Sequence, residues 1–547
     1  MNYHNRHIEQ EIKDCFGFSK AILLVGARQV GKTWILEKFG EEFADGFVRI
    51  NFDKQPEYRQ FFESSKDVRR ILKNIALASG RKITTDTLII FDEIQASADA
   101  LNSLKYFCED APEYYIACAG SLLGLQLTKG FPVGKVDFLD MGPMTFTEFL
   151  LASGDENLVE YIYDIDSIDR IPDAFINPLC EKLKMYFITG GMPEAVLVWT
   201  EDGDIKAADK VLSEILTAYQ SDFGKHADST SFPKIKLIWD SLPSQLAKEN
   251  KKFLYSAVKD GARAREYEDS LNWLYDADLV KKIYRITKPG LPISAYDDLS
   301  AFKIYMLDVG LLRKHSYLST STFAEENRLF TEFKGALTEN FVLQSLSRQF
   351  EVTPRYWAQV PHEVDFIIQR ENDVIPVEVK AGESVKSPSL KSYGKKYESE
   401  TPLMIRFSLK NLSLDGKILN VPLALIDRLN DLIDIAKNEM KNSAHTYRKK
   451  RFQRQPANRT MFARILSIRF ADSRGRLSLQ SVSDASPCGE VSKHHITLHP
   501  MGAIHHYGEA ITSLWRSHNI TAACRNISVL PLESRIMYIE GSSSFCT

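Results

Sequence analysis

The sequence of 547 residues lacks paired cysteines and long apolar runs. Its seven cysteines include no C-x-x-C pair, which excludes a zinc ribbon and a dithiol redox motif. The longest apolar runs, such as residues 21–26, are far shorter than the roughly 20 residues that cross a bilayer. The polar first residues also lack the apolar core of a secretory signal. We therefore expect a cytoplasmic protein with no membrane partner.

The chain also lacks a large excess of one charge, although the charge is unevenly distributed. The formal net charge of −3 argues against a uniformly basic surface for nucleic acid. From Met440 onward, however, 15 basic residues stand against 6 acidic ones, and helical and strand periodicity fades. The basic stretch Tyr447–Arg454 could serve as a nucleic-acid arm, and the histidine pairs 494/495 and 505/506 as metal ligands, but neither has a scaffold. We interpret residues 439–547 as an atypical basic tail that is unstructured or out of frame.

The first informative motif follows the apolar run Ala21–Val25, which is typical of a buried parallel strand. The next residues read G-x-x-x-x-G-K-T and lead into a helical pattern. Glycines at this spacing let a loop surround phosphates with backbone N–H groups, while the lysine reaches the β and γ phosphates and the threonine hydroxyl holds Mg²⁺. We therefore predict an ATP site made of Gly26, Ala27, Arg28, Gln29, Val30, Gly31, Lys32 and Thr33.

Two further strand ends carry polar residues suited to nucleotide hydrolysis. Asp92 and Glu93 follow the apolar strand 87–91, and Ser121 follows the strand 114–119. We expect Asp92 to hold the Mg²⁺ shell, Glu93 to polarise the attacking water and Ser121 to sense the γ phosphate. Ser121 could equally be a helix N-cap.

Strands predicted at 47–52 and 136–141 complete a set of five, separated by helical patterns. Alternating strands and helices give an open, parallel α/β sheet with ligands at the carboxyl ends of the strands. Thr145–Glu148 then has the pattern of a capping box that opens a helix.

Five ordered motifs resemble those of prokaryotic AAA+ ATPases with an AAA_14 P-loop domain and a C-terminal DUF4143 region, over residues 6–426. The resemblance implies ATP and Mg²⁺ binding and ATP hydrolysis. Ala27 departs from the proline that is usual in the family, without touching phosphate chemistry. The motifs are Gly26–Thr33, Asp92–Gln95, Met141–Phe149, Gly190–Ala195 and Phe302–Gly310.

Residues 231–315 have the pattern of a winged helix, with helices followed by a short strand pair. Its basic cluster could contact DNA phosphates, or it could be the solvated face of a domain that packs on the ATPase. Arg263 or Arg265 could also complete the ATP site of a neighbouring copy in a homo-oligomer. The cluster consists of Lys248, Lys251, Lys252, Lys259, Arg263 and Arg265.

The pattern of residues 316–438 resembles the PD-(D/E)xK nuclease fold. Glu339 lies in a helical pattern, Asp365 in one apolar strand, and Glu378 and Lys380 in the next. Period two places Glu378 and Lys380 on one strand face, and a carboxylate cluster with one cation suits a second Mg²⁺. The alternative is an ordinary half-buried strand with a polar outer face.

These patterns predict an α/β protein that binds and hydrolyses ATP with Mg²⁺ and acts on or with nucleic acid. Two alternatives stay open: an ATP-switched protein-binding module with an inactive nuclease-like domain, and an ATP-coupled DNA nuclease. The predicted segments are an AAA+ ATPase domain at 1–150, a helical lid at 151–230, a winged-helix-like domain at 231–315, a restriction-endonuclease-like domain at 316–438 and the tail at 439–547.

Overall fold

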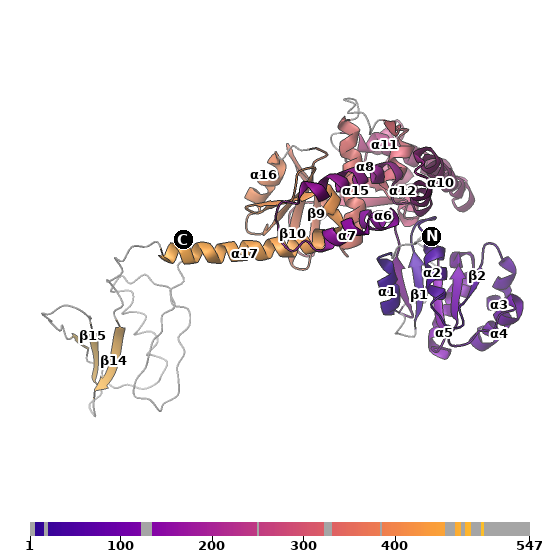
Figure 1. Ribbon diagram of the computed structural model, residues 1–547, viewed down its shortest axis with the longest axis horizontal. Helices are drawn as coiled ribbons and strands as arrows, with labels where there is room; N and C mark the ends of the chain where they lie inside the picture. The colour runs from indigo at the N-terminus through magenta and orange to yellow at the C-terminus, as the bar shows by residue number, and fades with distance from the viewer. Residues whose placement is uncertain are drawn as a thin grey trace. The chain divides into compact units, whose positions relative to one another are not determined.

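The computed structural model divides the chain into two compact units, Met1–Ser443 and Ala444–Thr547 (Figure 1). Among the helices it describes, none is long and apolar enough to cross a membrane. The residues described are 6–15, 20–121, 134–248, 251–321, 331–382, 386–453, 465–471, 476–482 and 494–496.

A five-stranded parallel sheet lies in the N-terminal part of the first unit, with the order β2-β3-β4-β1-β5. Every residue of β3 is buried, as expected for a strand covered on both faces. This confirms the predicted parallel α/β fold, and the helices around the sheet can be followed in Figure 1. The elements are α1 Ile8–Cys15, β1 Ala21–Val25, α2 Lys32–Gly40, β2 Phe47–Asn51, α3 Gln60–Glu63, α4 Val68–Ser79, β3 Leu88–Asp92, α5 Ala98–Asp110, β4 Tyr115–Ala119 and β5 Val136–Asp140.

A helical region follows the sheet. Its first helix begins with the predicted capping box: Thr145 Oγ1 accepts a hydrogen bond from the Glu148 N–H, and the Glu148 carboxylate accepts one from the Thr145 N–H. The helices are α6 Phe146–Ala152, α7 Glu156–Tyr163, α8 Asp173–Thr189, α9 Pro193–Asp202, α10 Ile205–His226, α11 Phe232–Leu246, α12 Ala264–Asp276 and α13 Val309–His315.

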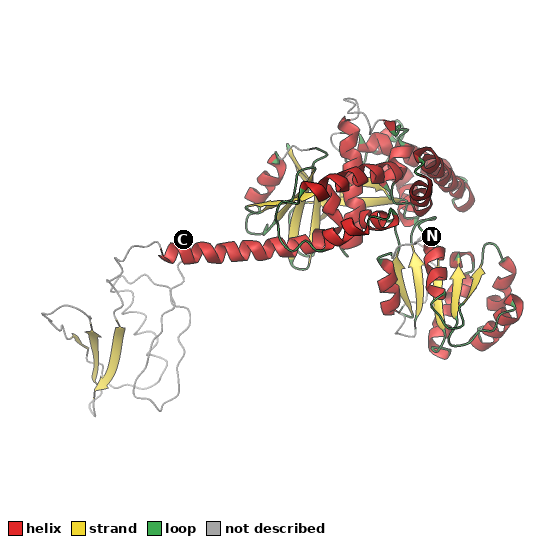
Figure 2. Cartoon of the chain, viewed as in Figure 1, coloured by secondary structure: helices red, strands yellow, loops and turns green. Residues whose placement is uncertain are grey.

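An eight-stranded mixed sheet has the order β12-β13-β11-β10-β9-β8-β6-β7. The strand pair expected for a wing is the antiparallel hairpin β6–β7, but β6 also pairs in parallel with β8 through Arg285 and Ile286. The sheet therefore runs across the predicted boundary at residue 315. Its strands are β6 Val280–Ile286, β7 Asp297–Met306, β8 Arg355–Gln359, β9 His362–Arg370, β10 Asp373–Val379, β11 Met404–Ser408, β12 Ser413–Asp415 and β13 Ile418–Pro422, with helices α15 Thr331–Gln349 and α16 Pro388–Lys396 (Figure 2).

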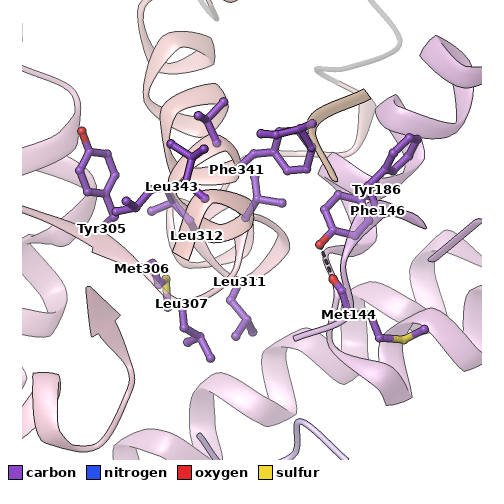
Figure 3. Packing of buried hydrophobic residues seen from close by; sticks show 14 of the residues in the cluster. Met144, Phe146, Tyr186, Tyr305, Met306, Leu307, Leu311, Leu312, Phe341 and Leu343 are labelled. Atoms are coloured by element: carbon purple, nitrogen blue, oxygen red, sulfur yellow. Dashed lines mark hydrogen bonds between the residues drawn. The ribbon is translucent and has the colours of Figure 1, made fainter. Parts of the chain in front are cut away.

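A large hydrophobic cluster joins the helical region to the mixed sheet (Figure 3). Phe341 on α15 packs against Tyr186 on α8, with ring centroids 5.5 Å apart. The Tyr186 hydroxyl donates to the Met144 carbonyl, so the buried phenol is satisfied. The helical region and the C-terminal sheet thus share one core.

Helix α17, Leu429–Gln453, continues beyond residue 440, where the sequence analysis expected regular structure to end. The second unit contains the antiparallel strands β14 Ile465–Ala471, β15 Arg476–Val482 and β16 His494–Ile496. His494 and His495 lie in β16, whereas His505 and His506 lie outside the described residues.

Candidate functional site: a phosphate-binding loop

The loop between β1 and α2 has the backbone of a phosphate-binding turn. Gly26, Gln29 and Gly31 have φ values of 135°, 66° and 99°, so the chain turns repeatedly through left-handed conformations. A Cβ atom on Gly26 would lie 2.1 Å from the Met141 carbonyl oxygen, and only glycine fits there. Ala27 and Val30 are buried and anchor the loop.

Lys32 lies at the first turn of α2 with its side chain folded over the loop. Its Nζ donates to the carbonyl oxygens of Gly26 and Ala27, at 2.9 and 2.7 Å. Burial lowers the pKa of Lys32 to about 8, against the opposing charge of Glu93. The ammonium group is thus positioned at the centre of the loop, where an anionic phosphate would stabilise its charged form.

Thr33 and Asp92 meet at the carboxyl edge of the sheet. Thr33 Oγ1 donates to Asp92 Oδ1 at 2.9 Å, and Asn51 Nδ2 at the end of β2 donates to Asp92 Oδ2 at 2.8 Å. The parallel register places Asn51 beside Asp92, so the asparagine orients the carboxylate. Asn51 is not among the site residues predicted from the sequence, although it lies near the end of the strand predicted at 47–52.

Glu93 and Ser121, which follow neighbouring strands, are in direct contact. Ser121 Oγ donates to Glu93 Oε2 at 2.9 Å, and Gln95 Nε2 donates to the same oxygen. Glu93 has a φ of 50°, a rare conformation for glutamate that turns the chain away from β3. These three side chains form one hydrogen-bonded group beside Asp92.

Arg28 links the loop to helix α10, a contact that the sequence analysis missed. Its Nε donates to Ser121 Oγ at 3.2 Å, and its Nη1 forms an ion pair with Asp222. Tyr219, one turn before Asp222, donates its hydroxyl to the Arg28 carbonyl at 2.8 Å. The feature that could have predicted this contact is Asp222, an acid on the buried face of α10, because a buried carboxylate needs a partner.

Arg6 forms a second contact that the sequence did not reveal. Its Nη1 and Nη2 donate to the carbonyls of Val30 and Gly142, at 3.3 and 2.8 Å. Its Nε lies 3.0 Å from Glu148 Oε2, with both side chains buried. The N-terminal segment therefore braces the loop against the start of α6.

A cavity of about 400 Å³ opens beside Gly26. Asp140, at the end of β5, and Asp278, after α12, line it together with Lys281 on β6. Lys281 forms an ion pair with Asp278, and Arg348 lies 3.4 Å from Asp140. Burial and the charge of Asp278 raise the pKa of Asp140. The segment that joins α12 to β6 thus brings charged groups close to the loop.

The acids predicted for a nuclease-like site fall into two separate sets of contacts. Glu339 is buried and Asp365 is half-buried, and desolvation together with the Glu339 charge raises the pKa of Asp365 to about 7. Asp365 Oδ2 accepts the Val379 N–H at 2.7 Å. Glu378 forms its ion pair with Lys380, at 2.7 Å. Within the described ranges, no three His, Cys, Asp or Glu side chains converge as metal ligands.

The side chains of the predicted basic cluster differ in their exposure and partners. Lys251 points inward and forms an ion pair with Glu339. Lys248 and Lys252 are half-buried, whereas Lys259, Arg263 and Arg265 are exposed.

Three segments of the chain match known protein families. Residues 18–150, which include the loop, Asp92, Glu93 and Ser121, match the AAA domain family. This chain carries an AAA ATPase domain. Residues 180–322 and 334–426 match two domains of unknown function, DUF8612 and DUF4143.

Solved structures similar to the chain are remote in sequence, and no curated protein matches it. A Walker-type ATPase of Pyrococcus abyssi is 14% identical with a TM-score of 0.36, covering 57% of this chain and 95% of its own. The RuvB Holliday junction branch migration motor of Thermotoga maritima is 14% identical with a TM-score of 0.24, covering 50% and 89%.

Proposed function

We propose that the AAA domain hydrolyses ATP with Mg²⁺ and transmits its nucleotide state to helix α10 through Arg28. One observation carries the proposal. Ser121 Oγ donates to Glu93 and accepts from Arg28, and Arg28 in turn pairs with Asp222 on α10. Glu93, the acid expected to act on water, is therefore linked to helix α10 by two hydrogen bonds and one ion pair, through Ser121 and Arg28.

The residues present suit Mg²⁺ beside the phosphates. The Thr33 hydroxyl and the Asp92 carboxylate are hard oxygen ligands 2.9 Å apart, and Asn51 fixes the carboxylate. Bound Mg²⁺ would supply Lewis-acid polarisation of the phosphoryl oxygens. Thr33 and Asp92 are the groups that would hold it.

Each side chain of the site has a separate role in the proposed hydrolysis. Lys32 neutralises phosphate charge, and the loop N–H groups orient the phosphates. Glu93 accepts a hydrogen bond from the attacking water and polarises it. Arg28 exchanges Asp222 for a phosphate oxygen, since both are anionic partners of a guanidinium. That exchange breaks the ion pair between Arg28 and Asp222 on α10 when ATP binds.

Phosphate release by the full chain, with and without Mg²⁺, tests the hydrolytic part. Lys32→Ala should abolish nucleotide binding, whereas Glu93→Gln should bind ATP and lower kcat by about 10² to 10⁴. Lys73→Ala, an exposed lysine on α4 of the same domain, is the matched control and should turn over normally. Normal turnover in both Lys32→Ala and Glu93→Gln would refute the site.

We further propose that the chain binds nucleic acid. Three exposed basic side chains within seven residues of chain support this proposal: Lys259, Arg263 and Arg265. DNA should raise ATP turnover, and the triple alanine variant should lose this stimulation at unchanged basal rate. Equal rates with and without DNA would leave a protein-directed ATP switch.

A further inference from the structure

A divalent metal at the C-terminal acids would need carboxylate oxygens that converge. Both oxygens of Glu339 already accept hydrogen bonds, one from Lys251 and one from the Tyr305 hydroxyl at 3.1 Å. Asp365 Oδ2 is engaged by the backbone of Val379. In the described part of the chain no three Asp, Glu, His or Cys side chains are arranged as metal ligands, and with these donors in place the carboxylates do not fit a divalent metal.

Two lysines from the preceding region supply positive charge to these acids instead. Lys303 on β7 is 0% exposed, forms an ion pair with Glu363 and lies 4.7 Å from the centroid of the Tyr356 ring. Lys251, 13% exposed, forms an ion pair with Glu339. A buried ammonium needs such a partner, since desolvation is otherwise very costly.

The backbone holds the two lysines on neighbouring segments. The Phe253 N–H, two residues after Lys251, donates to the carbonyl of Phe302, the residue before Lys303, at 2.8 Å. The lysines lie within residues 180–322, whereas the acids lie within 334–426. The region that matches DUF8612 thus supplies two lysine ammonium groups to the acidic side chains of the region that matches DUF4143.

We propose that Lys251 and Lys303 take the place of a divalent cation, so that the cluster of Glu339, Asp365 and Glu363 binds no metal. An ammonium hydrogen-bonded to a carboxylate repels a second cation at the same oxygens, and the repulsion is strong in a buried site. Metal-dependent phosphodiester cleavage is therefore not expected at this cluster. The C-terminal region instead depends on the middle region for its charge balance.

The test measures Mn²⁺ binding to the full chain by electron paramagnetic resonance, with Lys32→Ala in every sample so that no nucleotide-bound metal contributes. The chain with both lysines should bind no Mn²⁺ at the cluster. Lys251→Met should gain one site, with affinity raised about tenfold or more as the competing charge is removed. Adding Asp365→Asn should abolish that site, and Lys259→Met, an exposed lysine, should gain none.

Two results would overturn the proposal. One is Mn²⁺ bound by the lysine-intact chain and lost with Asp365→Asn, because the lysines would then not exclude metal. The other is a folded Lys251→Met variant that binds no Mn²⁺, because another feature would then exclude it. Where Lys251→Met does not fold, Mn²⁺ bound by the lysine-intact chain and lost with Asp365→Asn would still refute the proposal. None of these readings depends on ATP hydrolysis.

Discussion

The buried ion pair between Arg6 and Glu148 offers a quantitative test of how the N-terminal segment supports the phosphate loop. The side chains are 7% and 4% exposed, and Glu148 also accepts the backbone N–H groups of His7 and Thr145, each at 2.8 Å. Glu148→Gln removes the charge while keeping a residue type that suits the capping box, so it isolates the electrostatic term.

Breaking a buried pair from one side costs about 3 to 5 kcal/mol, because the remaining charge is buried without a partner. If residues 1–443 unfold as one unit, the entropy of unfolding is about 2.1 cal/mol/K per residue, and Tm should fall by about 3 to 5 °C. Calorimetry of the full chain measures this shift. Glu160→Gln, the same change at an exposed site on α7, should leave Tm unchanged.

The pair also predicts a pH dependence of stability. Burial alone would raise the pKa of Glu148, but the charges of Arg6 and His7 and the backbone N–H groups lower it below its usual 4.5. A depressed carboxyl pKa stabilises the fold above the unfolded-state pKa, and this stabilisation decreases as the pH falls through the folded-state value. The Tm difference should therefore be constant above about pH 5 and shrink below 4.5. An unchanged Tm in Glu148→Gln at pH 7 would refute the reasoning.

Three predictions concern the loop. Because the pKa of Lys32 is about 8 and only its ammonium attracts phosphate, ATP affinity should fall about tenfold from pH 7 to pH 9; equal affinities by fluorescent-nucleotide titration would contradict this. Asp222→Asn should free Arg28 for the phosphates and tighten ATP binding about fivefold, and weaker or equal binding would remove the proposed exchange. Ser121→Ala should lower kcat about three- to tenfold through loss of the hydrogen bond to Glu93, with ATP affinity retained; a shift in affinity alone would assign Ser121 to binding.

The candidate nucleotide site could be predicted because most of its residues are consecutive in the chain. An apolar run, a glycine-spaced loop and a helical pattern follow one another directly, so the sequence alone indicates the strand, the turn and the helix. Asp92 and Glu93 could be added because carboxyl ends of parallel strands share one edge of a sheet. Ion pairs between segments that are distant in the chain leave no comparable local pattern in the sequence. Arg28 and Asp222 are 194 residues apart, and only the buried place of Asp222 on α10 hints at a partner.

The C-terminal acids show where strand periodicity stops being informative. Alternation places Glu378 and Lys380 on one face, and the two side chains do form an ion pair. In β9, however, Val364 pairs with Trp357 and Ile367 with Arg355, so two residues of β9 stand opposite one residue of β8. The extra residue lies between Val364 and Ile367 and breaks the alternation at Asp365.

A bulge of this kind re-aims a side chain without leaving a mark in the hydrophobic pattern. Asp365 therefore shares its surroundings with Glu339 and Lys303, although the E-x-K spacing suggested a site built with Glu378. The cations of the cluster come from Lys251 and Lys303, which lie before the motif that runs from Glu339 to Lys380. The pattern of Glu339, Asp365, Glu378 and Lys380 is thus compatible with a metal site or with a set of internal ion pairs. The two lysines that precede it in the chain favour the ion pairs.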